Sequence, residues 1–266
     1  MKYNNVSKEQ LLYLKRHQRN RYIVVFCEFL LGIAFLSWWE IATRFEKINP
    51  FIFSSPSRIF KLTISMIKDK SLFVHLGVTI FETLISFFLI MVIGLIIAVI
   101  LWYTKTLSDI LEPYLVMLGS LPKTALAPIL IVWLGNNLKT IIVAAVSVAV
   151  FGTIITLHQN FRETPPDMIL LITTLGGTKK DVLTKVILPS SLPLIISTSK
   201  VNIGLSLVGV IIGEFLASNR GLGYLIIYGS QVFKLDLVIM SIILLCILSI
   251  CLYGIIHFIE KKVYKL

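Results

Sequence analysis

The residues of this sequence that could do chemistry are ionisable and hydroxyl side chains inside long apolar blocks. Lys200, Ser206 and Glu214 fall in or beside one block, and Lys123 follows Pro122 in another. An ionisable group at the centre of a membrane span costs about 2.5–3.5 kcal/mol on insertion scales, so it marks a candidate functional position. Near the end of a span the same residue only snorkels to the interface.

Two enzymatic chemistries can be tested on these positions. Gly204-Leu205-Ser206 has the context of a serine nucleophile, and His257 could be its base, as in an intramembrane serine protease. Ser206 would lie about 20 Å from the inner face and His257 within a turn of it, whereas a nucleophile and its base must be about 3 Å apart. Gly176-Gly177-Thr178-Lys179 lacks the first glycine of a phosphate loop and is followed by Lys180. We therefore expect no catalytic site, metal or bound ATP in this chain.

Composition places the chain in a lipid bilayer. Mean hydropathy is +0.89 and only 15% of residues are charged, against about a quarter in a soluble domain. Blocks such as 84–103 and 238–258 are long enough to cross the hydrocarbon as helices. The net charge of +11 gathers in loops and ends, as membrane topology requires, so we expect no nucleic-acid partner. Cys27, Cys246 and Cys251 fall inside apolar blocks and are expected to be buried.

Six apolar segments predict an all-α membrane protein with six transmembrane helices. They cover about residues 23–41, 76–102, 111–134, 138–157, 192–213 and 237–259. The third carries Pro113, Pro122 and Pro128, which are tolerated where a span is buried in protein or lines a cavity. Ser55-Pro56 predicts the start of an amphipathic helix lying on the membrane surface.

The predicted domain organisation is a basic arm (1–22), a membrane domain (23–260) and a short basic tail (261–266). Six spans place both ends on one side, and the excess of Lys and Arg predicts that this side is the cytoplasm. Ser7 and Gln10 have capping-box spacing, which predicts a short helix in the arm, lying on anionic headgroups.

The polar segment of about residues 158–190 has its own helix signals. They are, in order, Thr164-Pro165 with Asp167, Gly176-Gly177, Thr178 with Asp181, and Leu188-Pro189. The first pair opens a short helix that the double glycine closes, and Thr178 opens a second helix that runs to Leu188-Pro189. Such an element can dock into a groove on another protein. An ordinary loop with incidental caps is the alternative, and the spacing alone leaves both open.

Residues 173–189 resemble the coupling-loop signature of ABC importer permeases, in which a glycine stands ten residues before an I-x-L-P ending. Gly176, Val186, Leu188 and Pro189 match that spacing. The residues that the resemblance assigns to an ATPase-coupling loop are Leu170, Leu171, Ile172, Leu175, Gly176, Gly177, Thr178, Lys179, Lys180, Asp181, Val186, Leu188 and Pro189.

The chain departs from this signature at its opening, where Glu-Ala-Ala falls on Leu170, Leu171 and Ile172. The acidic contact usual in the family is therefore absent, and any contact with an ATPase would be mainly apolar. Residues 54–57, 121–135 and 213–226 resemble, in the same order, segments of the permeases for sulfonates, taurine, nitrate and vitamin precursors. The resemblance covers nearly the whole chain.

The resemblance implies a type I ABC importer permease in a bacterial plasma membrane. Two permease chains, most simply a homodimer, would form the pathway, and a cytoplasmic ABC ATPase dimer would bind ATP and Mg and receive the coupling loops. An extracytoplasmic solute-binding protein would deliver a small organic anion, or a vitamin or its precursor. This chain would hold no cofactor and carry out no catalysis itself.

The candidates for the translocation pathway are Pro122, Lys123, Thr124, Lys200, Asn202, Ser206 and Glu214. Lys200, about 12 Å into its span, could face the pathway or pair with a carboxylate, and Glu214 at the outer end caps or gates. Gly209 and Gly213 form a G-x-x-x-G that permits close helix approach. The basic candidates favour an anion. The alternative class is a secondary transporter or channel, which a broken third span would suit, but which leaves the capped loop unexplained.

Overall fold

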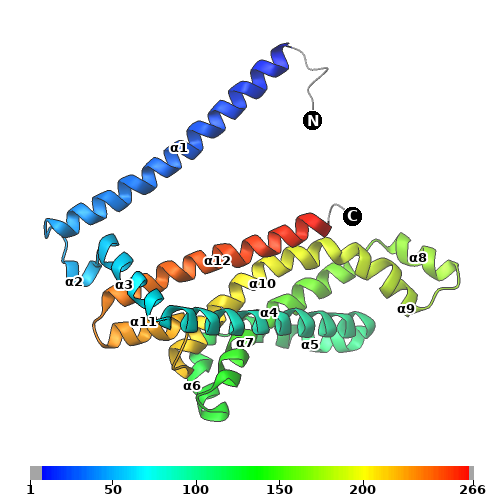
Figure 1. The fold of residues 1–266 in the computed structure, drawn as a ribbon. Helices are drawn as coiled ribbons and strands as arrows, with labels where there is room; N and C mark the ends of the chain where they lie inside the picture. The colour runs from blue at the N-terminus through cyan, green and yellow to red at the C-terminus, as the bar shows by residue number, and fades with distance from the viewer. Residues whose placement is uncertain (1–7, 264–266) are drawn as a thin grey trace. The chain divides into compact units, whose positions relative to one another are not determined.

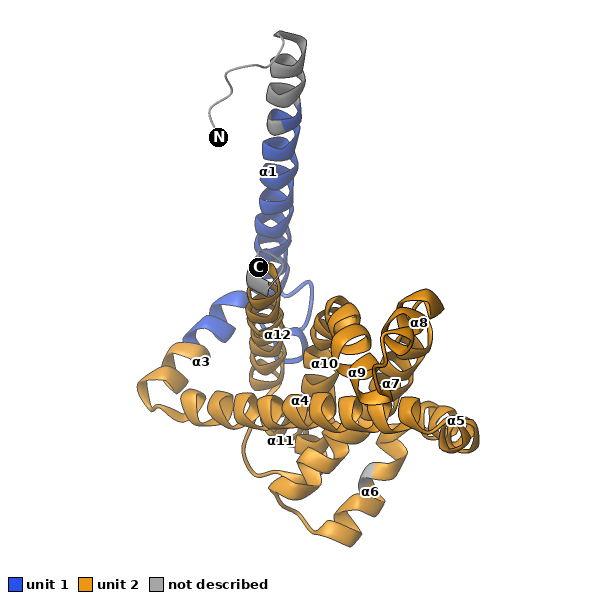
Figure 2. Cartoon of the chain, turned by 90° about the vertical axis from the view of Figure 1, so that its right-hand side faces the viewer, with its two compact units in different colours: residues 1–62 blue, residues 63–266 orange. Residues whose placement is uncertain are grey.

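The computed structural model describes residues 8–263, and this part of the chain is built of helices (Figure 1). It divides into two compact units, residues 1–62 and 63–266 (Figure 2). The helices are α1 (Lys8–Arg44), α2 (Pro50–Phe53), α3 (Pro56–Lys68), α4 (Ser71–Tyr103), α5 (Lys105–Ser120), α6 (Lys123–Leu134), α7 (Leu138–Arg162), α8 (Pro166–Thr174), α9 (Lys179–Val182), the π turn η1 (Leu183–Ile187), α10 (Leu188–Ala217), α11 (Leu222–Gln231) and α12 (Leu235–Val263).

Among these helices, five are long and apolar enough to cross a membrane, or six when one bent pair is counted as a single span. The five are the 19–44 part of α1, then α4, α7, the continuous run 179–217, and α12. The pair is α5 and α6, which meet at 87°. The six predicted spans are confirmed, but the third is not one straight helix over 111–134. It begins at Lys105 and breaks at Leu121 and Pro122, whose backbones are extended.

The first unit departs from the prediction at its amino end. A short separate helix in the arm was expected, whereas α1 runs without a break from Lys8 into the span. The physical reason is that residues 17–23 contain no Gly or Pro to interrupt a helix. Residues 1–7, with Ser7, and residues 264–266 of the tail lie outside the described residues. At the C-terminal end of the chain, α12 extends to Val263 and includes the first residues of the predicted tail.

The predicted start of α3 at Ser55-Pro56 is confirmed. Glu40, near the end of α1, accepts hydrogen bonds from the Ser57 backbone N–H (3.0 Å) and from its hydroxyl (2.9 Å). A carboxylate at the first turn of a helix complements the unpaired N–H groups there, so Glu40 fixes the start of α3.

Three helices form the core of the second unit. α7 packs along both α10 and α4, and α10 also contacts α4. An added Cβ atom at Gly209 would lie 2.6 Å from the Ala145 Cα, and one at Gly213 would lie 2.9 Å from the Ile141 Cα. The close helix approach predicted from the G-x-x-x-G is therefore present, between α10 and α7.

The run from α9 through η1 to α10 corrects two predicted boundaries. A helix end at Leu188-Pro189 was expected, yet the helix continues because η1 precedes the proline. The Leu188 N–H bonds to the Leu183 carbonyl oxygen, five residues back, and this wider turn relieves the clash that a proline ring otherwise makes. The predicted loop from residue 214 is also wrong, since α10 continues to Ala217.

The expectation that the cysteines are buried is wrong. Cys27, Cys246 and Cys251 are exposed and free. They lie on α1 and α12, whose apolar sequences also expose large side chains such as Phe29 and Ile250. In a membrane helix, outward-facing apolar groups meet lipid rather than water, so apolar sequence does not predict burial inside the protein.

Candidate functional site

The segment between α7 and α10 folds as the predicted pair of short helices. α8 begins at Pro166 without a side-chain cap, and Thr164 is buried, so the predicted Thr164–Asp167 capping box does not form. The other end of α8 is closed by the double glycine, as predicted. Gly176 has φ of +81°, and the Gly177 N–H donates to the Ile172 carbonyl oxygen at 2.9 Å. This is the left-handed closure for which glycine is suited.

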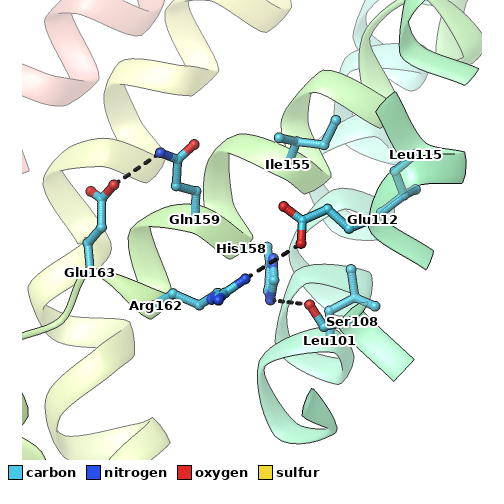
Figure 3. Close-up of a pocket in the computed structure, with 9 residues that line it drawn as sticks. All are labelled: Leu101, Ser108, Glu112, Leu115, Ile155, His158, Gln159, Arg162 and Glu163. Atoms are coloured by element: carbon cyan, nitrogen blue, oxygen red, sulfur yellow. Dashed lines mark hydrogen bonds and ion pairs between the residues drawn. The ribbon is translucent and has the colours of Figure 1, made fainter. Parts of the chain in front are cut away.

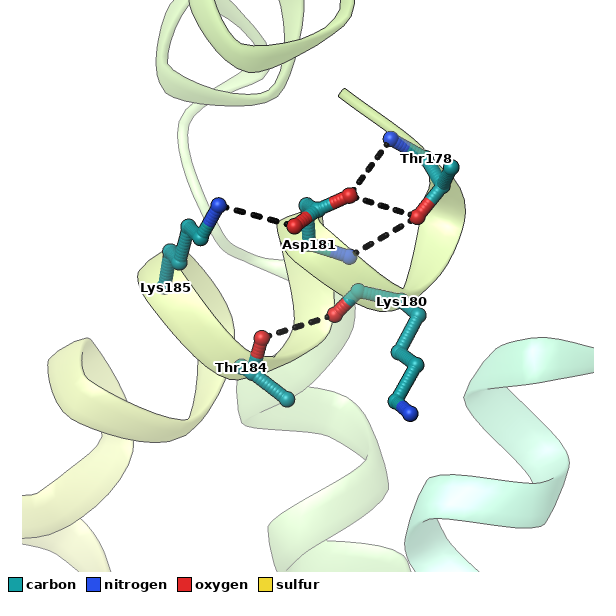
Figure 4. A network of polar contacts seen from close by, with 5 residues as sticks. All are labelled: Thr178, Lys180, Asp181, Thr184 and Lys185. Atoms are coloured by element: carbon teal, nitrogen blue, oxygen red, sulfur yellow. Dashed lines mark hydrogen bonds and ion pairs between the residues drawn. The ribbon is translucent and has the colours of Figure 1, made fainter.

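The predicted capping box at the start of α9 is confirmed (Figure 4). The Asp181 carboxylate accepts from the Thr178 N–H at 2.9 Å and from its hydroxyl at 2.6 Å, and the Asp181 N–H donates back to that hydroxyl at 3.3 Å. Lys185 pairs with the other carboxylate oxygen at 2.8 Å. α9 lies at one end of a 39-residue run, about 58 Å long, which far exceeds the hydrocarbon thickness. Outside the membrane in this way, the Asp181 carboxyl has its pKa held below its usual range by Lys185 and Thr178.

Apolar packing holds this element against the membrane helices. Val182 and Ile187 are buried in one cluster with Leu157 and Phe161 of α7, and Ile172 packs against it. Across the element, the Lys179 ammonium donates to the Tyr103 carbonyl oxygen at 2.6 Å. The element is therefore tied to the ends of α4 and α7.

The outer face of α8 is apolar and uncovered. Leu170 and Leu171 are each 60% exposed and Leu175 is 77% exposed. The predicted coupling residues thus divide into three groups. Leu170, Leu171, Leu175 and Lys180 face outward. Ile172, Val186 and Leu188 are partly buried. Lys179 and Asp181 make contacts within the chain.

The two basic pathway candidates are occupied within the chain. Lys123, beside Pro122 and the exposed Thr124 at the α5–α6 break, donates to the carbonyl oxygens of the last turn of α5 and lies 5.4 Å from the Phe151 ring centroid. Lys200 forms an ion pair with Glu260 of α12. The sequence left two possibilities for Lys200, facing the pathway or pairing with a carboxylate, and the structure shows the second.

Asn202 and Ser206 take different positions on α10. The Asn202 side-chain nitrogen donates to the Thr153 hydroxyl at 2.8 Å and approaches the Met91 sulfur at 3.2 Å, so it joins α10 to α7 and α4. Ser206 is fully buried and donates to the Ile203 carbonyl oxygen. His257 is bonded to Glu260 instead, so the structure does not bring together the serine and histidine tested as a catalytic pair.

Glu214 is the centre of a buried polar cluster that caps α11. It accepts from the Thr79 hydroxyl at 2.6 Å and from the Gly223 N–H at 2.5 Å, and Thr79 in turn accepts from the Leu222 N–H at 2.8 Å. Glu82 of the same α4 face is also buried, at 2% exposure.

Glu82 stands out in the sequence as an ionisable residue inside an apolar block, but its grouping with other α4 residues around Glu214 was not predicted. His75 also belongs to this cluster, because its Nδ1 accepts from the Gly221 N–H at 3.1 Å. The signal was present in the spacing, since His75, Thr79 and Glu82 fall at i, i+4 and i+7, on one face of α4.

A second group that the sequence did not reveal lines a pocket of about 380 Å³ between α4, α5 and α7 (Figure 3). Glu112 and Arg162 face each other across it at 3.6 Å, and the Ser108 hydroxyl lies 3.1 Å from the His158 Nε2. Ser108 with Glu112 and His158 with Arg162 are each spaced i, i+4, which places each pair on one helix face. Charged groups of both signs and apolar side chains together line the pocket.

Comparison with known proteins agrees with this geometry. Residues 90–265 match the family described as the binding-protein-dependent transport system inner membrane component. The chain belongs to this family. It is therefore an ABC importer permease, a membrane translocation component rather than a catalytic subunit.

The relatives of this permease are named for several different solutes. An ABC transporter permease of Haemophilus influenzae is 29% identical over 84% of this chain and 90% of its own length. The formylaminopyrimidine transport permease of Halalkalibacterium halodurans is 27% identical over 70% and 74%. The taurine transport permease of Escherichia coli is 22% identical over 84% and 82%.

Solved structures show the same fold for this permease. The MetNI methionine ABC transporter, in an inward-facing conformation, matches with a TM-score of 0.60 and 21% identity, over 70% of this chain and 92% of its own. The predicted type I importer architecture is confirmed. Membership of the family excludes the two alternatives considered from sequence, a secondary transporter or channel and an intramembrane protease.

Proposed function

We propose that this permease forms a solute pathway with a second copy of itself and that α8 and α9 dock on a separate cytoplasmic ATPase. That ATPase would bind ATP and Mg, and the permease would contribute no group to hydrolysis. The observation that carries the proposal is the exposed apolar face of α8, formed by Leu170, Leu171 and Leu175.

The character of this face supports a protein partner. Three leucines exposed on a short helix beyond the membrane lose free energy to water unless another surface covers them. A helix that lays such a face into a groove is a common recognition mode. Because Leu170 to Ile172 replace the acidic opening of the family signature, the contact would depend on apolar area.

The anchoring of the element supports a mechanical role. Val182 and Ile187 pack on α7, Lys179 binds the end of α4, and α9 continues through η1 into α10. A push on α8 would therefore reach the three core helices together, since packed helices move as rigid bodies. In this way closure of the ATPases on ATP would alternate the access of the pathway.

In the proposed membrane topology, both termini lie in the cytoplasm of a bacterium and the six spans lie in its plasma membrane. α8 and α9 then face the cytoplasm, because four spans precede them. α11, after the fifth span, faces outward, where an extracytoplasmic binding protein would deliver the solute. The solute would be a small anion such as a sulfonate, taurine or nitrate, or a vitamin or its precursor, as for the named relatives.

The test is to purify the tagged chain in mild detergent from its own host and to measure the mass of the intact complex. The expected mass contains two permease and two ATPase subunits. A permease that remains without an ATPase in several mild detergents would contradict the coupling role.

A further inference from the structure

A groove runs between α7 and α10 on the surface of the second unit. Its volume is about 360 Å³. The polar groups along it are Thr153, Thr156, Ser197, Thr198 and Asn202, and aliphatic side chains form the rest of the lining. None of the lining residues carries a charge.

The hydrogen-bonding groups left for a ligand can be identified one by one. Asn202 is only 3% exposed, and its side-chain nitrogen donates to the Thr153 hydroxyl and approaches the Met91 sulfur, so this residue serves helix packing. In the described part of the chain, the Thr156, Ser197 and Thr198 hydroxyls make no hydrogen bond to the backbone, whereas the Ser199 hydroxyl does. The groove therefore presents three hydroxyls on an apolar surface.

This chemistry is poorly matched to an anion. A desolvated anion needs a cation or several N–H donors to replace its water. The two lysines predicted to line the pathway already have partners within the chain, since Lys200 pairs with Glu260 and Lys123 binds the end of α5.

We propose that this groove is the solute-contacting wall of the pathway and that it selects an uncharged polar solute with N–H or O–H donors on an apolar skeleton. The proposal rests on the proposed importer function and narrows its solute to a neutral heterocycle of the vitamin-precursor type. Thr156, Ser197 and Thr198 determine the specificity. This reverses the preference for an anion drawn from Lys123 and Lys200 in the sequence.

The first test changes the sign of a charge in the groove. Ser197 is exposed, so both Ser197→Asp and Ser197→Lys can be accommodated. The complete importer, with its ATPase and binding protein, is reconstituted in vesicles and assayed with formylaminopyrimidine, riboflavin, methanesulfonate and nitrate. We expect ATP-driven uptake of an uncharged probe, lowered in both variants to within about threefold of each other. An anion passing within about 6 Å of this site would separate the two variants by at least about 100-fold.

The outcomes distinguish the proposal from the function on which it rests. Uptake of methanesulfonate or nitrate alone, with a large Lys-to-Asp ratio, overturns the neutral-solute proposal and leaves the importer intact. Absence of an ATPase from the purified complex contradicts the importer itself, and that result comes from the mass measurement rather than from uptake.

A hydroxyl deletion provides the matched pair. Thr198→Val removes a groove hydroxyl without changing volume, and we expect it to raise KM for the uncharged probe about fivefold through the lost hydrogen bond. Ser199→Ala is the control, because its hydroxyl donates to the Ile195 carbonyl oxygen at 2.8 Å and does not line the groove. Equal KM values for Thr198→Val and the parent would contradict solute contact at this wall.

A labelling experiment shows whether the groove is open to solute or is filled by packing against a second permease subunit. Cys27, Cys246 and Cys251 are first replaced by Ser, and Ser197→Cys is introduced. We expect a water-soluble maleimide to label the new thiol and the transported probe to protect it. A thiol that is never labelled, but cross-links directly to its copy in the second permease, would show that subunit packing fills the groove.

Discussion

The Lys179 ammonium lies 2.6 Å from the backbone carbonyl oxygen of Tyr103, and this bond ties α8 and α9, the proposed coupling element, to the last residue of α4. The same ammonium lies 4.9 Å from the Tyr103 ring centroid and 5.6 Å from that of Trp102. A cation at the C-terminal end of a helix satisfies carbonyls that have no partner in the helix. Lys179 therefore acts within the subunit, although it falls in the segment assigned to partner contact.

Replacing Lys179 by Met should loosen the coupling element from α4 while the protein stays in the membrane. Loss of about 1 kcal/mol from this contact would lower uptake per ATP hydrolysed about fivefold. The ratio is measured in vesicles with the complete importer. Lys180→Met is the control, since Lys180 is exposed and its ammonium contacts no other group among the described residues. Equal ratios in the two variants would remove Lys179 from the coupling path.

At Gly176 the backbone, rather than the surrounding space, limits substitution. Its φ is +81° and nothing lies within 4 Å of an added Cβ atom. A β-branched or bulky charged residue there costs about 1–2 kcal/mol or more in the left-handed region, whereas Asn tolerates it. We expect Gly176→Glu and Gly176→Val to uncouple ATP hydrolysis from uptake, and Gly176→Asn to retain most of it. Normal transport by Gly176→Glu would rule out the coupling-loop assignment.

The exposed leucines of α8 should carry the affinity for the ATPase. Leu171→Asp and Leu175→Asp place a charge in an apolar contact and should reduce the ATPase recovered with the tagged permease at least about tenfold. Leu175→Met keeps the apolar area and should recover as much as the parent. The comparison is a quantitative gel of the purified complex, and full recovery with both Asp variants would place the contact elsewhere.

The cluster around Glu214 should determine the stability of the outer end of the second unit. Glu214→Ala leaves the Gly223 N–H buried without its acceptor, at about 1–3 kcal/mol, and removes the 2.6 Å bond of the Thr79 hydroxyl, so it should lower Tm in detergent by about 5–10 °C. Gly221→Ala should be at least as severe, because its φ is +106° and its Cβ would lie 2.2 Å from Glu214 Oε1. Gly254→Ala, with nothing within 4 Å, is the control. An unchanged Tm for Glu214→Ala would mean that the cluster does not hold α11.

Contact between α10 and α7 can be tested at a single methyl group. Gly209→Ala would place a Cβ 2.6 Å from the Ala145 Cα, and such overpacking costs about 1–3 kcal/mol. Gly204→Ala, on the same helix with open space around it, should leave Tm unchanged or slightly raised. Both are compared by melting in the same detergent, and a drop in Gly204→Ala equal to that in Gly209→Ala would indicate a helix-propensity effect instead.

The sequence by itself determined the features whose causes are local. Six apolar segments predict six spans because each must satisfy its own backbone hydrogen bonds in lipid. The capping box at Thr178 and Asp181 was predictable because its atoms lie three residues apart. The close approach at Gly209 and Gly213 was predictable because small residues four apart share a helix face. The sequence did not predict that α7 is the helix on which this face of α10 packs.

Only the tertiary structure decided which polar groups meet and which stay available. Lys200 finds Glu260 on another helix, and Glu214 finds Thr79, 135 residues away in the chain. The helix continues through Pro189 because of the π turn at η1, and no residue type in the sequence predicts such a turn. The physical reason is common to these cases: the relative register and rotation of packed helices come from the interlocking of whole faces, and no short stretch of sequence contains that information.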